Sequence, residues 1–200
     1  MFKPNKIVLV VCYGFVATFM LWATTAFRLP AYQQKPAVKM IEVQDTFPIP
    51  KPNPKQLFYL QRTPNTNTIV YELNEDAKGQ IIIDEPVVVH WLRFAEDGAK
   101  KDLNYIQRVF AYGIKTEKVT DTSFEMHINS YRKKPLYLMR QKTDNTYHMF
   151  SFINIKMVML KRVFIRIDAG VSFWKPNVIY IEMKGIDMAT GKEAMERFKV

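Results

Sequence analysis

The three histidines, His90, His127 and His148, are the side chains of this 200-residue sequence best suited to acid–base chemistry. A metal site needs several ligands at close spacing, and each histidine falls in a separate predicted strand, so we expect no metal. His90 is the most interesting of the three, because an acidic residue such as Glu72 would complete an acid–base pair with it. The alternative is a partly buried histidine whose hydrogen bonds are satisfied within the fold.

Motifs for nucleophilic or phosphate chemistry are missing from the sequence. No Gly-x-Ser-x-Gly element is present, and residues 189–192 lack the upstream glycine of a phosphate-binding loop. Residues 74–85 match a calcium-binding loop in part, but Lys78 occupies a position that needs an oxygen ligand. Cys12 is the single cysteine, which excludes an intrachain disulfide. We therefore assign no catalytic residue and expect no cofactor.

Two polar stretches are the local candidates for binding. Residues 62–68 read RTPNTNT and lie between two apolar runs. They predict a loop of turn-forming residues, with Arg62, Asn65 and Asn67 as candidate ligand contacts. The second candidate is a helix face. The candidate binding residues on that face are Gln107, Arg108 and Tyr112, and His90 completes the set.

Short runs of β-branched and aromatic residues position these side chains. The predicted strands are 56–62, 68–73, 79–83, 86–94, 114–119, 123–131, 135–141, 146–158, 161–168 and 177–184, with 192–199 as a strand or a frayed tail. Alternation in 161–168 places Val163 and Ile165 on one face and Arg162 and Phe164 on the other. The pattern predicts a mainly β domain, an antiparallel β-sandwich or a partly open barrel.

One segment has helical rather than β spacing. Leu103, Ile106, Phe110 and Ile114 recur at intervals of three or four residues, and Asn104 with Gln107 resembles a capping box. Gly113 is a plausible C-terminal stop. The spacing predicts one short helix at about 104–112 that covers a sheet face or an open barrel end.

The N-terminal region predicts export. Residues 7–26 carry no charge, follow Lys3 and Lys6, and are long enough to cross a bilayer. Residues 1–26 are thus a transmembrane anchor or a signal peptide cleaved after Ala26. Prolines are frequent in 27–55, which predicts an extended spacer after an N-terminal apolar helix. The domain would then span 56–200, outside the cytoplasm and membrane-anchored or periplasmic.

Basic side chains outnumber acidic ones, with a net charge of +10. Clusters at 132–134, 140–142 and 161–162 lie among tyrosines, a pattern that attracts anionic partners. Beyond a membrane, these partners would be anionic envelope lipid or polysaccharide rather than nucleic acid. Residues 7–26, if they are not cleaved, would bind the membrane itself. A solvated surface without any ligand explains the same clusters.

Four pieces of the chain resemble a known family: LFYLQRTPNTNTIVYELN (57–74), EPVVVHWLRFAEDG (85–98), LNYIQRVFAYGI (103–114) and VIYIEMKGIDMATGK (178–192). Together they are similar to an uncharacterised family of exported domains of unknown function from Gram-negative bacteria. The resemblance covers nearly all of 56–200 and implies an independent domain in an envelope context. It implies no activity, cofactor or catalytic residues.

These observations favour a non-enzymatic envelope module that binds a ligand or partner. One alternative is an enzyme that acts on an envelope polymer or lipid, with His90 at its centre. Another is a carrier of apolar ligands, suggested by aromatic and methionine residues such as Met149 and Phe152. A pocket holding His90 and a carboxylate favours the enzyme, and a large apolar cavity favours the carrier.

Overall fold

The computed structural model describes residues 47–168 and 177–200, which belong to a compact unit spanning Asp45–Val200. The predicted signal or anchor and the spacer up to residue 46 lie outside the described residues. Eleven strands and short helical turns make up the described part. They are β1 (Gln56–Arg62), β2 (Asn65–Leu73), β3 (Val87–Arg93), η1 (Phe94–Glu96), β4 (Ala99–Asp102), α2 (Tyr105–Gln107), η2 (Arg108–Tyr112), β5 (Ile114–Thr120), β6 (Ser123–Ile128), β7 (Tyr131–Arg140), β8 (Tyr147–Ile153), β9 (Lys156–Ile167), β10 (Val178–Asp187) and β11 (Glu193–Phe198). The prediction of a mainly β domain with one short helix is confirmed. No helix among these residues is long and apolar enough to cross a membrane.

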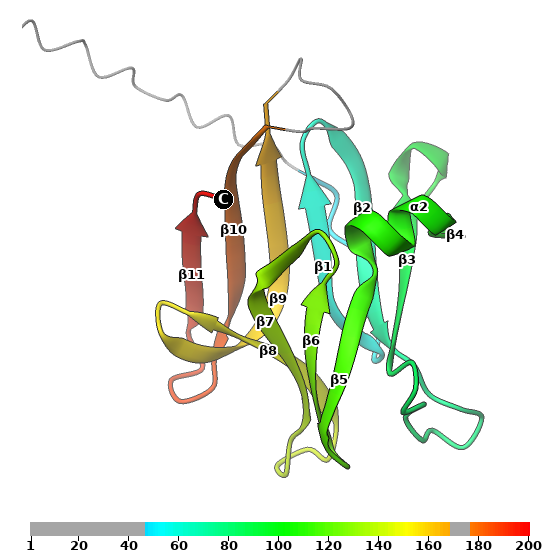
Figure 1. Ribbon diagram of the computed structural model, residues 1–200, viewed down its shortest axis with the longest axis vertical. Helices are drawn as coiled ribbons and strands as arrows, with labels where there is room; N and C mark the ends of the chain where they lie inside the picture. The colour runs from blue at the N-terminus through cyan, green and yellow to red at the C-terminus, as the bar shows by residue number, and fades with distance from the viewer. Residues whose placement is uncertain (1–46, 169–176) are drawn as a thin grey trace, which may run out of the picture. The chain divides into compact units, whose positions relative to one another are not determined.

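The long strand β9 organises the sheet. Its first residues pair with β8 and its later residues pair with β1, so two groups of strands leave the same edge of β9. Strands β1–β4 continue the layer of β9–β11, while β5–β8 curl in front of it (Figure 1). The result is a curled, open half-barrel. The β1–β9 pairing is parallel, which corrects the prediction of a purely antiparallel sheet.

The concave side of this curl holds the core. Phe58 on β1 and Tyr71 on β2 are fully buried and stack with ring centroids 4.2 Å apart. Leu138 and Met149 from the front strands are also fully buried. Burial of large apolar side chains is the main driving force of folding, so this face carries most of the stability.

The predicted helix is present, but its second half is wider than an α-helix. The Asn104 side chain accepts from the Gln107 N–H and the Gln107 side chain accepts from the Asn104 N–H, as the capping box predicted. Residues Arg108–Tyr112 form a π-helical turn that ends at Gly113. A Cβ atom at Gly113 would lie 2.0 Å from the Arg108 carbonyl oxygen, so close backbone approach explains this glycine.

Several predicted boundaries were wrong. Residues 79–83 were predicted as a strand but form none; Ile81 makes an isolated bridge with Glu75. Strand β4 was not predicted, because its charged residues show no apolar alternation. The predicted strand 146–158 is split by a turn at 154–155, and β9 continues from there through 161–167. The run 192–199 is a strand, β11.

The convex face of the sheet is partly covered by residues 47–55, which we call the strap. Phe47 packs against Phe164 of β9 with ring centroids 5.2 Å apart, and the buried Gln61 donates to the Pro48 carbonyl oxygen at 2.9 Å. Pro50 is buried as well. These contacts explain why Phe164 is buried although it shares a face of β9 with the charged Arg162.

Candidate functional site: a groove on the convex face

A groove of about 640 Å³ lies on the convex face, over β2 and β3. Lys51, Asn53 and Gln56 border it from the strap and the start of β1. Phe94, Asp97 and Gly98 border it from the turn between β3 and β4, and Lys100 borders it from β4. The floor includes Glu72, His90, Val70 and Leu92. A volume in this range suits a small-molecule ligand.

Strand register explains why the polar floor residues meet. Val70 of β2 is paired with His90 of β3, and Glu72 is paired with Val88, so Glu72 and His90 are diagonal neighbours on one face. On the next strand, Lys100 is paired with Leu92. Since side chains alternate along a strand, Glu72, His90 and Lys100 all point to the convex side.

The carboxylate of Glu72 is the centre of the cluster. The Lys100 ammonium donates to Glu72 Oε2 at 2.8 Å, and the Asn53 side-chain amide donates to Glu72 Oε1. His90 Nδ1 lies 3.6 Å from Glu72 Oε2, just beyond hydrogen-bond range. His90 itself is only 3% exposed, and its buried Nδ1 has no hydrogen-bond partner within the described part of the chain. An unpaired buried polar atom is costly, so it needs an explanation.

Electrostatics set the protonation states of this pair. Burial lowers the pKa of His90 below its ordinary value of about 6.5, although the Glu72 carboxylate acts in the opposite direction. The imidazole is therefore mostly neutral at pH 7. Burial acts to raise the pKa of Glu72. Hydrogen bonds from Lys100 and Asn53, together with the positive charges of Lys100 and of His90 when it is protonated, outweigh burial and lower the pKa. Glu72 is therefore ionised at pH 7.

The arrangement offers two kinds of chemistry. A neutral imidazole beside a carboxylate can bind a ligand hydroxyl or amide group through Nδ1, or it can act as a general base. Cations, amides and carboxylates border the same groove together with the ring of Phe94. Neither chemistry needs a metal or cofactor.

The polar island of the sequence lies elsewhere and is shorter than predicted. The turn consists of Thr63 and Pro64, joined by a cis peptide bond, and β2 already begins at Asn65. The Asn65 side chain accepts from the Asn67 N–H at 2.8 Å. The Arg62 guanidinium lies over the Tyr112 ring, 6.0 Å from its centroid. Arg62 Nε and Asn67 Oδ1 are buried and have no hydrogen-bond partners among the residues that the structure describes.

The predicted helix face does not form one exposed surface. Gln107 accepts from the Trp91 indole N–H at 3.1 Å in addition to its capping role. Arg108 pairs with Glu85 at 3.5 Å, and the buried Tyr112 accepts through its carbonyl from the Tyr71 hydroxyl at 3.0 Å. Gln107 and Tyr112 brace the helix against the sheet, and Arg108 ties it to the turn before β3. Tyr112 lies next to Arg62, on the opposite face of the sheet from His90.

Sequence reasoning named His90 and Glu72 but missed their neighbours. Lys100 sits on a strand with no apolar alternation, and Asn53 belongs to a Pro-rich stretch that looked like a free spacer. The only available signal was the single Asn among the prolines of 48–54.

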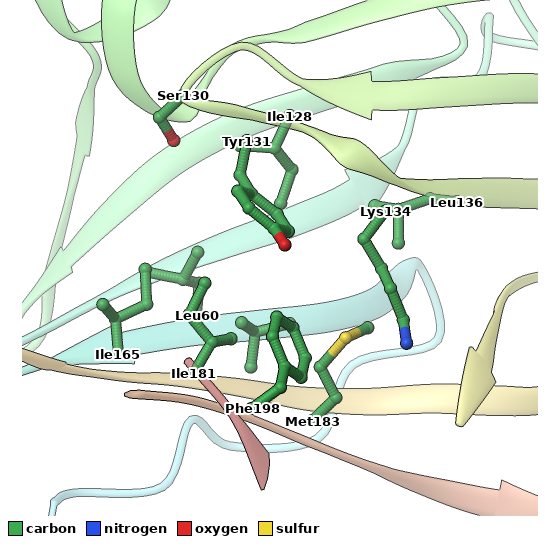
Figure 2. Close-up of a pocket in the computed structure, with 11 residues that line it drawn as sticks. Leu60, Ile128, Ser130, Tyr131, Lys134, Leu136, Ile165, Ile181, Met183 and Phe198 are labelled. Carbon is green, nitrogen blue, oxygen red and sulfur yellow. The ribbon is translucent and has the colours of Figure 1, made fainter. Parts of the chain in front are cut away.

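A second hollow lies on the concave side, between the front and back layers. Figure 2 shows Ile128, Tyr131, Lys134 and Leu136 facing Leu60, Ile165, Ile181, Met183 and Phe198 across this slot. Its volume is about 40 Å³, enough for one or two water-sized groups. The Lys134 ammonium at its border is paired with Glu196 at 2.7 Å. The slot is a packing gap in the core.

Comparison with known proteins identifies a family. No curated protein and no solved structure matches this chain. Residues 58–197 match the model of a domain of unknown function, DUF4833, and this range covers all of the sites described above except the strap, the first residues of β1 and Phe198 of the slot. The predicted resemblance to a domain of unknown function is thereby confirmed, while its bacterial range and export stay predictions. The chain belongs to the DUF4833 family.

Proposed function

We propose that this domain is a non-enzymatic module of the cell envelope that binds saccharide units of an envelope polymer in the convex-face groove. The observation that carries the proposal is the buried Nδ1 of His90, which borders the groove and has no hydrogen-bond partner among residues 47–168 and 177–200. A ligand hydroxyl or amide group would satisfy it.

The border of the groove suits a polyhydroxylated ligand. Asn53 and Gln56 supply amide groups, Asp97 supplies a carboxylate and Lys51 supplies an ammonium, so donors and acceptors surround the floor. Phe94 is partly exposed beside them and offers an aromatic surface for the apolar face of a sugar ring. Mixed charges favour a ligand that needs both donors and acceptors over a simple anion.

The envelope location in this proposal rests on the N-terminal sequence. Residues 7–26 are uncharged and follow two lysines, which is typical of an export segment. The strap is the continuation of that chain and forms one wall of the groove. A ligand in the groove would therefore contact the part of the domain nearest to the tether.

Titration of the full chain in detergent with the β-1,4-linked N-acetylglucosamine tetramer tests the proposal. Binding is measured by calorimetry and by the ring resonances of His90. We expect saturable binding that shifts the His90 signals, is lost in His90→Gln and is retained in His148→Gln, whose histidine lies on β8 and does not line the groove. His90 signals that stay unchanged at millimolar tetramer would overturn the proposal.

A second function, hydrolysis of the same polymer, is favoured by one observation. The neutral His90 lies beside the ionised Glu72, which is the arrangement of a general base. Release of reducing ends from the tetramer would support this alternative if it disappeared in both His90→Gln and Glu72→Gln. Binding without product supports the binding module.

An apolar-ligand carrier has weaker support than either. The slot of about 40 Å³ is far smaller than the 300–1,000 Å³ of typical ligand pockets. The groove is larger, but charged and polar residues border it.

A further inference from the structure

The short helix carries an apolar surface that faces away from the sheet. We call the side chains of Tyr105, Ile106, Val109 and Phe110 the knob; they are 76%, 50%, 37% and 69% exposed. The sequence predicted that Ile106 and Phe110 would cover a sheet face. Instead, Leu103 and Tyr112 are buried against the sheet and the knob is exposed, although Val109 also borders a hollow of about 390 Å³ together with Val87 and Val89 of β3. Contiguous exposed apolar side chains mark interaction surfaces.

The knob lies at the same end of β1 as the point where the strap enters. Phe47 packs on Phe164, and Phe164 is paired with Gln61 near the end of β1. The next residue, Arg62, lies over the ring of Tyr112, the last residue of η2. The chain that precedes Phe47 thus joins the domain at the end where the knob is exposed.

A bilayer is the partner that these features fit. Residues 7–26 form an uncharged apolar stretch, and residues 27–46 span at most about 70 Å when fully extended, so a membrane that holds 7–26 is within reach. Tyrosine and phenylalanine are favoured at the membrane–water interface. The net charge of +10 attracts anionic headgroups.

We propose that the knob of Tyr105, Ile106, Val109 and Phe110 seats in the interfacial region of an anionic lipid bilayer. The seat holds the knob end of the half-barrel against the membrane surface. It is independent of what the groove binds, because the knob and the groove belong to opposite faces of the sheet.

The test places a polarity-sensitive NBD label at one position of the full chain. Cys12→Ser removes the native thiol, and the label is attached to Phe110→Cys in the knob or to Val119→Cys as the control. Val119 is 61% exposed and lies near the last residue of β5, whereas the knob helix leads into the first residue of that strand. Both proteins are reconstituted in vesicles of phosphatidylcholine with or without phosphatidylglycerol.

We expect the emission of the label at residue 110 to shift to the blue in vesicles, more strongly with phosphatidylglycerol, while the label at 119 keeps its aqueous emission. Circular dichroism of both labelled proteins checks that they are folded. Equal emission at the two positions would overturn the proposal. A blue shift at residue 110 that needs no lipid and grows with protein concentration would assign the knob to a second copy of the chain, and would equally overturn it.

Discussion

Two hollows of this domain, the slot and the groove, lie on opposite faces of the same sheet and differ in size and polarity. The slot on the concave face is small and lined mainly by apolar side chains that pack across it. The groove on the convex face is sixteen times larger and holds an ionised carboxylate beside a neutral, unpartnered imidazole. The contrast indicates that the concave face supplies stability, while the convex face, walled by the strap, is free to carry function.

The largest effect is expected from a change in the concave core. Phe58→Ala removes a fully buried ring that stacks on Tyr71, and we expect it to lower the free energy of unfolding by about 3–5 kcal/mol. Urea denaturation measures the loss. Phe152→Ala is the control, because Phe152 is 40% exposed and should cost much less. Equal losses would contradict the assignment of stability to the concave face.

The groove should respond to pH where the core does not. The folded-state pKa of His90 is lowered, so below pH 6.5 the unfolded state takes up protons that the folded state resists. Stability should therefore fall as the pH is lowered from 6.5 through the folded pKa of His90. It should change little above pH 6.5, where His90 is neutral in both states.

Comparison of variants by urea denaturation at several pH values measures this dependence. His90→Gln should remove the loss that begins below pH 6.5, whereas His148→Gln should keep it. Glu72, whose pKa is also lowered in the fold, contributes a separate loss that begins only below about pH 4.5. A His90→Gln profile identical to the parent profile would show that His90 titrates normally.

The groups that face His90 should shift its pKa in opposite directions. They are Glu72 on β2, Lys100 and Asp102 on β4, and Asn53 of the strap, which holds Glu72. Glu72→Gln removes a charge that raises the pKa of His90, so it should lower it further. Lys100→Met removes a charge that lowers the pKa and should raise it. Ring-proton NMR titration measures both, with His127 and His148 as internal references; two shifts of the same sign would refute the assigned geometry.

A smaller effect is expected where the strap is held. Phe47→Ala removes the ring contact with Phe164, and an aromatic pair of this kind contributes about 0.5–1.5 kcal/mol beyond its buried area. Backbone amide hydrogen exchange should then increase in the strap and around Gln61, which donates to the strap, while the core strands keep their protection. Tyr137→Ala, which breaks a ring pair on the front strands, should leave the strap unchanged.

Local sequence patterns predicted well those features that depend only on residues close together in the chain. Strand β1 was predicted with its observed ends, and the capping box at Asn104 and Gln107 is present because it depends only on residues three apart. Alternation also placed His90 on the same face as Val88 and Leu92. These features need no knowledge of long-range pairing.

What could not be predicted depends on contacts between distant residues. The parallel pairing of β1 with β9 joins residues about 100 positions apart, and it decides which layer β1 enters. The knob residues have helical apolar spacing, which indicates a buried face, yet Ile106 and Phe110 are exposed. The groove needs the strap, and no local rule shows that a Pro-rich segment will lie on a sheet.

The smallest effect distinguishes an underpacked region of the core from a full one. Val163 borders the slot, and Val163→Ile adds one methylene that the 40 Å³ of space can accept. A buried methylene contributes about 0.8 kcal/mol, so we expect stabilisation of at most this size in urea denaturation. Val158 is equally buried but lies directly against Gly185, where even a new Cβ would come within 2.7 Å of it. Val158→Ile should therefore destabilise, because overpacking forces neighbours apart. Destabilisation by both changes would mean that the slot in Figure 2 closes in solution, and that the concave face has no space to fill.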